Sequence, residues 1–180
     1  VPVPVRTERF RHALETVAGS GPAFLKSAKI LAGNAATQKS PAPVARDLRI
    51  LVAEDNAVNQ RVIQLQLRKA GFEAKIVANG VEVLKALEKD TFDLVFMDCQ
   101  MPEMDGYEAT RQIRLQERTK DLYVVAMTAN SLDGDRERCL ASGMSAYLSK
   151  PTRESDLLAA LETAASLAAQ KKSRAQNPGA

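Results

Sequence analysis

Five polar side chains stand at or just beyond the ends of short apolar runs: Glu54, Asp55, Asp98, Thr128 and Lys150. Three carboxylates that lie close together repel one another, and their pKa values rise unless a cation neutralises them. Mg²⁺ suits such a group, because it takes one or two carboxylates together with phosphate oxygens. A carboxylate beside Mg²⁺ can in turn accept a phosphoryl group and become an aspartyl phosphate.

The remaining residue types fit the same chemistry. The ammonium of Lys150 can place a point charge on phosphoryl oxygens, and the hydroxyl of Thr128 can form a hydrogen bond with one of them. The sequence has no cluster of histidines and cysteines with the spacing of a zinc site. It also lacks the glycine-rich GxxxxGK[ST] loop that binds nucleotides, so the phosphoryl donor must come from elsewhere.

Strand and helix signals alternate along the part of the chain that carries these residues. Strands are predicted over Ile50–Ala53, Glu73–Val77, Asp93–Met97, Leu122–Met127 and Ala146–Ser149. Helices are predicted between Asn56 and Gly71, after Asn79–Gly80, over Tyr107–Gln116, between Ser131 and Gly143, and over Arg153–Ala168. The first helix carries Val58, Val62 and Leu65 with Ile63 and Leu67 alongside, and the second has Val81, Leu84 and Leu87 on one apolar stripe.

Five β-α units in series predict an α/β fold, a doubly wound five-stranded parallel sheet with helices on both faces. In such sheets the functional residues gather beyond the carboxyl ends of the strands. Any one polar residue at a strand end can be an ordinary surface charge. Because all five fall at the same edge, their convergence favours a functional site with Asp98 at its centre.

Four runs together resemble a known family: ILVAEDNAVNQ, DLVFMDCQMPEMDGYEATRQIR, VVAMTAN and AYLSKP. They resemble the receiver domain of response regulators in two-component signalling, and most of all the receivers attached to hybrid sensor histidine kinases. The resemblance covers residues 49–168 and its motifs stand in the family's order. It implies the flavodoxin-like receiver fold, preceded here by a helical and linker segment.

The resemblance also implies roles for single residues. Asp98 is the expected phosphoacceptor, with Thr128 and Lys150 in contact with the phosphoryl group. The expected Mg²⁺ ligands are Glu54, Asp55, Asp98 and the backbone carbonyl of Gln100. The peptide bond before Pro151 is expected to be cis. Tyr147 matches the family's aromatic switch position, although a half-buried packing residue remains an alternative for it.

The implied partners are the phosphohistidine domain of a histidine kinase, a histidine phosphotransfer domain, or both. The resemblance places partner contacts on the first helix, near Asn59, Ile63 and Leu67. Such a receiver catalyses its own phosphorylation and dephosphorylation in a phosphorelay, and its parent protein is expected to be a histidine kinase. Phosphorylation would move Thr128, let Tyr147 turn inward and reshape the face made by the fourth helix, fifth strand and fifth helix.

Two other functions stay open at this stage. The domain can be a receiver fold that binds a partner whatever its phosphorylation, but the complete acidic group argues against that. A hydrolase that forms an aspartyl phosphate intermediate would carry a second aspartate two residues after its nucleophile, and that place is Gln100.

Residues 3–19 match residues 150–166 at seven positions without a gap: Pro4, Arg6, Ala13, Leu14, Glu15, Thr16 and Ala18 against Pro151, Arg153, Ala160, Leu161, Glu162, Thr163 and Ala165. We expect residues 1–18 to be the terminal helix of a preceding degenerate receiver-like domain, with Val3 where Lys150 would stand. Two unrelated amphipathic helices remain the alternative. Residues 19–48 are expected to be a short helix and linker, and residues 169–180 a disordered basic tail.

The net charge of +3 comes from the flanks, because residues 49–168 contain more acidic than basic residues. The basic tail is short and has no aromatic residue, so we expect no nucleic acid partner. No apolar run is long enough to cross a membrane, and the two cysteines, Cys99 and Cys139, are expected to be reduced packing residues. These features predict a cytoplasmic domain, whose parent kinase can itself be membrane-attached. The oligomeric state is left open.

Overall fold

Five parallel strands form one sheet in the computed structural model, which describes residues 47–129 and 133–176. They are β1 (Ile50–Ala53), β2 (Ala74–Val77), β3 (Leu94–Asp98), β4 (Tyr123–Thr128) and β5 (Ala146–Ser149). Their order in the sheet is β2-β1-β3-β4-β5, and each neighbouring pair is parallel. The predicted doubly wound sheet is confirmed, and it places β1 and β3 side by side at the point where the strand order reverses.

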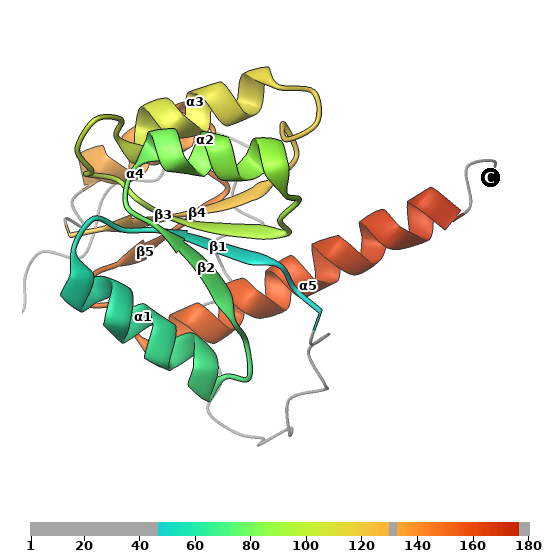
Figure 1. The fold of residues 1–180 in the computed structure, drawn as a ribbon, viewed down its shortest axis with the longest axis horizontal. Helices are drawn as coiled ribbons and strands as arrows, with labels where there is room; N and C mark the ends of the chain where they lie inside the picture. The colour runs from blue at the N-terminus through green and yellow to red at the C-terminus, as the bar shows by residue number, and fades with distance from the viewer. Residues whose placement is uncertain (1–46, 130–132, 177–180) are drawn as a thin grey trace, which may run out of the picture. The chain divides into compact units, whose positions relative to one another are not determined.

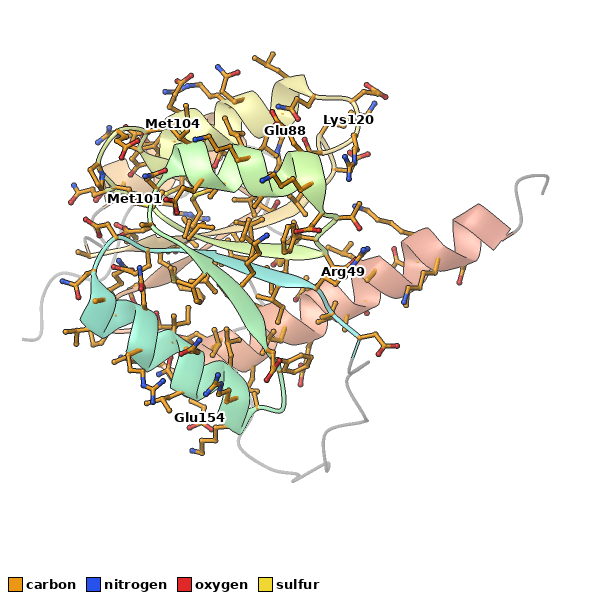
Figure 2. All side chains as sticks on the ribbon, viewed as in Figure 1. Arg49, Glu88, Met101, Met104, Lys120 and Glu154 are labelled. Atoms are coloured by element: carbon orange, nitrogen blue, oxygen red, sulfur yellow. The ribbon has the colours of Figure 1, made fainter. Side chains whose placement is uncertain are left out.

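Helices cover both faces of the sheet. They are α1 (Ala57–Lys69), α2 (Gly80–Lys89), α3 (Gly106–Leu115), α4 (Asp133–Ala141) and α5 (Glu154–Gln176). Figure 1 shows α1 and α5 on one face of the sheet and α2 and α3 on the other. An exposed ion pair at 2.8 Å joins Lys69 near the end of α1 to Glu154 at the start of α5, and Glu154 is labelled in Figure 2.

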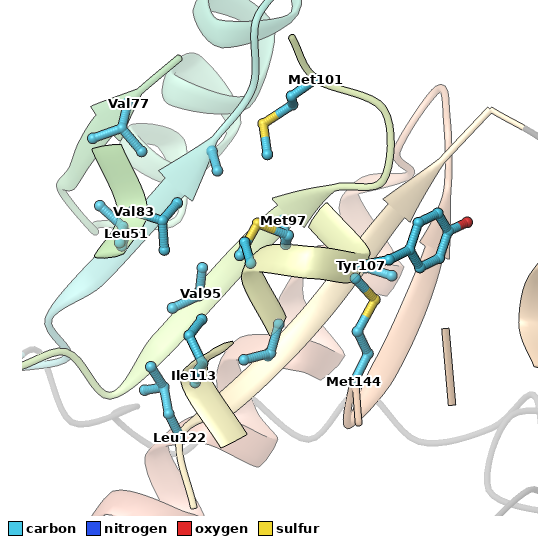
Figure 3. Packing of buried hydrophobic residues seen from close by; sticks show 14 of the residues in the cluster. Leu51, Val77, Val83, Val95, Met97, Met101, Tyr107, Ile113, Leu122 and Met144 are labelled. Atoms are coloured by element: carbon cyan, nitrogen blue, oxygen red, sulfur yellow. The ribbon is translucent and has the colours of Figure 1, made fainter. Parts of the chain in front are cut away.

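The core has two layers because successive residues of a strand point to opposite faces of the sheet. In β3, Leu94 and Phe96 pack toward α1 and α5. Val95 and Met97 pack toward α2 and α3, in the cluster that Figure 3 displays. Every residue of β3 is buried, as a central parallel strand covered on both faces requires.

Polar caps fix the places where the loops at the carboxyl edge become helices. The side chain of Asn56 accepts hydrogen bonds from the backbone amides of Val58 and Asn59, at 2.9 and 3.2 Å. Asn79 and Asp105 cap α2 and α3 in the same way. A cap satisfies backbone amides that have no partner inside the helix, so each of these residues sets the register in which its helix starts.

The structure buries one of the two apolar sets that the sequence places on α1. Ile63 and Leu67 are 4% and 0% exposed, whereas Val58, Val62 and Leu65 are 70%, 49% and 51% exposed. Both sets have helical spacing, so periodicity alone left α1 with two apolar stripes. The position of the sheet decides between them, and that position depends on contacts far away in the sequence.

Two further predictions about helices are corrected. The buried residues of α2 are Val83, Ala86 and Leu87, with Val81 and Leu84 only partly buried. α5 continues to Gln176, whereas its end was predicted at Ala168 with a disordered tail beyond it. The added segment is rich in Ala, Gln, Lys and Arg, which favour helix, and the first proline after it is Pro178.

The predicted terminal helix over residues 1–18 and the start of the helix predicted from Ser131 lie outside the described residues. Of the segment predicted over residues 19–48, only the last two residues are described. Among the residues that the structure does describe, no helix combines the length and the apolar character needed to cross a membrane.

Candidate functional site

An acidic cluster lies at the carboxyl edge of the two central strands. Glu54 and Asp55 follow β1, and Asp98 is the last residue of the neighbouring strand β3. One carboxylate oxygen from each residue lies within 4.8 Å of the others. The strand order therefore joins side chains that are more than forty positions apart in the sequence.

Glu54 is buried and fixed from several directions. Its Oε1 accepts a hydrogen bond at 2.8 Å from Nδ2 of Asn59, in the first turn of α1. Its backbone amide donates to the carbonyl of Val77 at 3.0 Å, and its carbonyl accepts from Nε2 of Gln60 at 2.6 Å. The sequence analysis did not predict that Asn59 and Gln60 position Glu54. The presence of two polar residues about one helical turn after the acidic pair could have indicated this role.

Lys150 connects the two buried carboxylates. Its Nζ lies 2.5 Å from Oε2 of Glu54 and 2.7 Å from Oδ2 of Asp98. Its backbone amide donates at 2.7 Å to the carbonyl of Thr128, and the peptide bond between Lys150 and Pro151 is cis. The ammonium is thus the internal counterion of the cluster in this structure.

Burial and hydrogen bonding act in opposite directions on these ionisable groups. Burial raises the pKa of the Asp98 carboxyl, against the hydrogen bonds from Lys150 and from the amide of Gln100. Burial lowers the pKa of the Lys150 ammonium, but its hydrogen bonds to Asp98 and Glu54 outweigh that effect, so the pKa is raised. Lys150 is therefore charged at neutral pH, while Asp98 is a less acidic carboxyl than usual.

The loop after Asp98 bends back over the end of β3. The amide of Gln100 donates at 3.1 Å to Oδ1 of Asp98, and the amide of Gly106 donates at 3.3 Å to the carbonyl of Cys99. A Cβ atom at Gly106 would lie 2.1 Å from the backbone oxygen of Asp98. Only glycine fits here, because α3 begins in direct contact with the backbone of the candidate phosphoacceptor.

Thr128 and Tyr147 lie on the next two strands. Thr128 is the buried last residue of β4, next to Met127, which pairs with Asp98 in the sheet. Tyr147 lies in β5 with 42% of its surface exposed, and the guanidinium of Arg136 stands 5.9 Å from its ring. The structure therefore brings Thr128 to the edge of the cluster and leaves Tyr147 turned toward solvent.

Two of the three residues predicted to contact a partner are buried in the structure, so that part of the prediction is wrong. Ile63 and Leu67 are packed in the core beneath α1, so they have no surface to offer a partner. The exposed apolar side chains of that helix are Val58, Val62 and Leu65.

The donor set of the cluster fits a hard divalent cation. It offers three carboxylates, one of them the exposed Asp55, and oxygen ligands are those that Mg²⁺ prefers. A cleft of about 480 Å³ opens beside it. Its lining includes Asp55, Cys99, Gln100, Met101, Pro102, Asp105, Tyr107 and Arg138.

Comparison with protein families assigns the chain to a class. Residues 50–162 match the response regulator receiver domain, so the chain belongs to that family. The resemblance read from the sequence is confirmed.

The curated relatives are named as histidine kinases. The chain is 40% identical over 121 residues to "Hybrid signal transduction histidine kinase B" of Dictyostelium discoideum, a match covering 61% of this chain and 6% of that protein. It is 43% identical over 105 residues to "Sensor histidine kinase RcsC" of Escherichia coli strain K12, covering 58% of this chain and 11% of that protein. The chain therefore matches only a small part of the length of these relatives.

Solved structures show the same fold. The receiver domain of sensor histidine kinase PA1611 from Pseudomonas aeruginosa PAO1, with a magnesium ion in its active site cleft, has 43% identity and a TM-score of 0.62, covering 66% of this chain and 98% of that one. The Saccharomyces cerevisiae receiver of Ssk1, crystallised with the phosphotransfer protein Ypd1, has 32% identity and a TM-score of 0.58, covering 61% and 83%.

The close approach of Gly106 to Asp98 gives a direct test of the site geometry. We expect Gly106→Ala to lower the free energy of unfolding by about 2 kcal/mol or more, because its new methyl group meets backbone rather than a flexible side chain. Urea denaturation measures the change. The control is Leu115→Ala, an exposed position on the same helix, where we expect a change within about 0.5 kcal/mol. Equal stability of Gly106→Ala and the wild type would contradict this geometry.

Proposed function

We propose that the domain accepts a phosphoryl group on Asp98 from a phosphohistidine of another domain or protein. The observation that carries this proposal is the buried carboxylate of Asp98, bound to Lys150 at 2.7 Å inside a cluster of three carboxylates. A buried aspartate with a cationic partner and a solvent-open cleft beside it is suited to group transfer rather than to packing.

In the proposed step, a carboxylate oxygen of Asp98 attacks the phosphorus atom. The phosphorus–nitrogen bond breaks, a phosphorus–oxygen bond forms, and the histidine nitrogen takes up a proton from solvent. Lys150 exchanges its bond to Asp98 Oδ2 for one to a phosphoryl oxygen, and Thr128 forms a hydrogen bond to another. Glu54, Asp55, Asp98 and the carbonyl of Gln100 would hold Mg²⁺, which would supply positive charge to the phosphoryl oxygens.

The same step provides a conformational signal. Thr128 and Lys150 are already joined by a backbone hydrogen bond, so movement of either toward a phosphoryl group acts on the edge between β4 and β5. Tyr147 lies on β5 with its ring partly exposed, and in the proposed switch it turns inward in the phosphorylated state. A pre-existing equilibrium biased by the new charge is sufficient for such a switch.

A histidine phosphotransfer domain or kinase domain is the proposed donor. Exposed Val58, Val62 and Leu65 form an apolar surface on α1, the helix whose first turn carries Asn59 next to Glu54. The pairing of Ssk1 with Ypd1 is a precedent for a receiver with this kind of partner. Because both relatives are histidine kinases and one is named as a hybrid, we propose that the parent protein is a hybrid histidine kinase.

Phosphorylation-independent binding is the alternative function, and one experiment separates it from phosphoryl transfer. Incubation with Mg²⁺ and acetyl phosphate should raise the intact mass of the wild type by one phosphoryl group. Asp98→Asn should show no gain, because the amide cannot act as the nucleophile.

The matched control is Asp93→Asn at the opposite end of β3, where the carboxylate accepts a hydrogen bond from the amide of Arg49 at 2.9 Å. This variant should gain the phosphoryl group as the wild type does. A wild type that stays folded and unmodified, or an equal gain in Asp98→Asn, would count against the proposal.

The α1 surface gives a second prediction, on the donor. Val62→Glu should slow phosphoryl transfer from phosphorylated yeast Ypd1 about tenfold, because it places a charge in an apolar contact. A tenfold change corresponds to a loss of about 1.4 kcal/mol in binding free energy. The transfer rate is followed by loss of label from Ypd1. Leu115→Glu, an exposed position on α3, should transfer at the wild-type rate. Equal rates for both variants would exclude the α1 surface as the docking site for Ypd1.

A further inference from the structure

Two cysteine thiols meet directly beside the candidate phosphoacceptor. Sγ of Cys99 lies 3.7 Å from Sγ of Cys139, although forty positions separate them in the sequence. Both are free and buried. Cys99 follows Asp98 in the chain and Cys139 lies in α4, so the pair joins the end of β3 to a helix that the proposed phosphorylation step does not otherwise use.

We propose that Cys99 and Cys139 are a site of oxidative modification, at which a small hydroperoxide such as hydrogen peroxide forms a reversible disulfide that slows phosphorylation of Asp98. The disulfide itself does not depend on the proposed function. Its effect on Asp98 rests on that function.

The separation of the sulfurs suits this bond. A disulfide needs a sulfur–sulfur distance of about 2.05 Å, so the two atoms have to approach each other by less than about 2 Å. The backbone is fixed at both ends of the pair. The amide of Cys99 donates to the carbonyl of Met127 at 3.1 Å, and the carbonyl of Cys139 accepts from the amide of Met144 at 3.0 Å. The thiols therefore meet as part of the folded structure.

The surroundings assign different roles to the two thiols. Cys99 lines the cleft of about 480 Å³, and Cys139 is not among the residues that line it. A hydroperoxide entering the cleft reaches Cys99 first. There the sulfur takes one oxygen atom, forming a sulfenic acid and releasing one molecule of water.

The thiol of Cys139 then attacks the sulfenic sulfur, forms the disulfide and releases a second molecule of water. In the sum, two thiols and one hydrogen peroxide give one disulfide and two waters, so the pair loses two electrons and two protons to the peroxide. A thiol reductant such as dithiothreitol reverses the change by exchange.

The local chemistry makes this reaction slow. Both sulfurs are buried, which limits the access of an oxidant to the pair. Tyr107 packs in the same core cluster, beneath the guanidinium of Arg138 at 4.7 Å from its ring, and is labelled in Figure 3. Because packing limits access to both sulfurs, we expect the pair to stay reduced unless the oxidant persists.

The proposed disulfide affects phosphorylation of Asp98 because of the two segments that it would connect. The residue after Asp98 would become covalently attached to α4, which belongs to the face that the proposed switch reshapes. In the proposed switch α4 moves relative to the loop after Asp98, and the disulfide opposes that movement. The expected effect is a phosphorylation rate about tenfold lower, a barrier higher by about 1.4 kcal/mol.

The first arm of the test follows the disulfide by mass. The purified domain is treated with hydrogen peroxide, quenched, and analysed by intact mass without reductant after alkylation. The wild type should lose two hydrogen atoms and resist alkylation at both cysteines, and dithiothreitol should restore both thiols. Cys139→Ala should form no such intramolecular product. Far-UV circular dichroism checks its folding, and Cys139→Ser replaces it if it is unfolded. A folded wild type whose thiols stay separate under persistent peroxide would overturn the proposal.

The second arm measures the phosphorylation rate with acetyl phosphate and Mg²⁺. The oxidised wild type should react about tenfold more slowly than the reduced wild type, and dithiothreitol should restore the rate. Peroxide should slow Cys139→Ala less than it slows the wild type, because Cys99 of this variant cannot become attached to α4. Equal rates for oxidised and reduced wild type would overturn the effect on Asp98. A reduced wild type that gains no phosphoryl group would instead show that the proposed function fails, while the mass arm still decides whether the disulfide forms.

Discussion

The contact of one ammonium with two buried carboxylates is the constraint on which the site depends. Glu54 and Asp98 lie almost fully buried beside each other, and without a cation their charges would destabilise the fold. Lys150 supplies that cation from the end of β5, the strand at one edge of the sheet. The chain therefore keeps an acidic cluster whose charge is only partly neutralised by its own lysine, with the exposed Asp55 and an open cleft for a ligand.

The rest of the domain places these three residues. The strand order sets β1 beside β3, and the fixed end of β4 carries the carbonyl that positions the backbone of Lys150. Gly106 lets α3 start against the backbone of Asp98, and Asn59 with Gln60 holds Glu54 from α1. Each support comes from a different element, so the geometry of the site requires the complete fold.

Much of this arrangement could be predicted from the sequence. Alternating apolar runs and caps such as Asn56 indicate β-α units, and the rule for parallel sheets places Glu54, Asp98 and Lys150 at one edge. The same local information could not choose between the two apolar stripes of α1. Nor could it show that Cys99 meets Cys139, because that contact depends on how α4 packs against the end of β3. Sequence periodicity gives the type of an element, whereas the face it buries and its distant contacts follow from tertiary packing.

Titration with Mg²⁺ tests the central claim, that this cluster is a divalent cation site built around an internal counterion. Isothermal titration calorimetry measures Mg²⁺ binding to the wild type and to Asp55→Asn. Asp55 is chosen because its carboxylate is exposed and is not bonded to Lys150. The account predicts one saturable site in the wild type, and binding weaker by about tenfold or more in a folded Asp55→Asn. No binding to the folded wild type, or equal binding to both proteins, would contradict it.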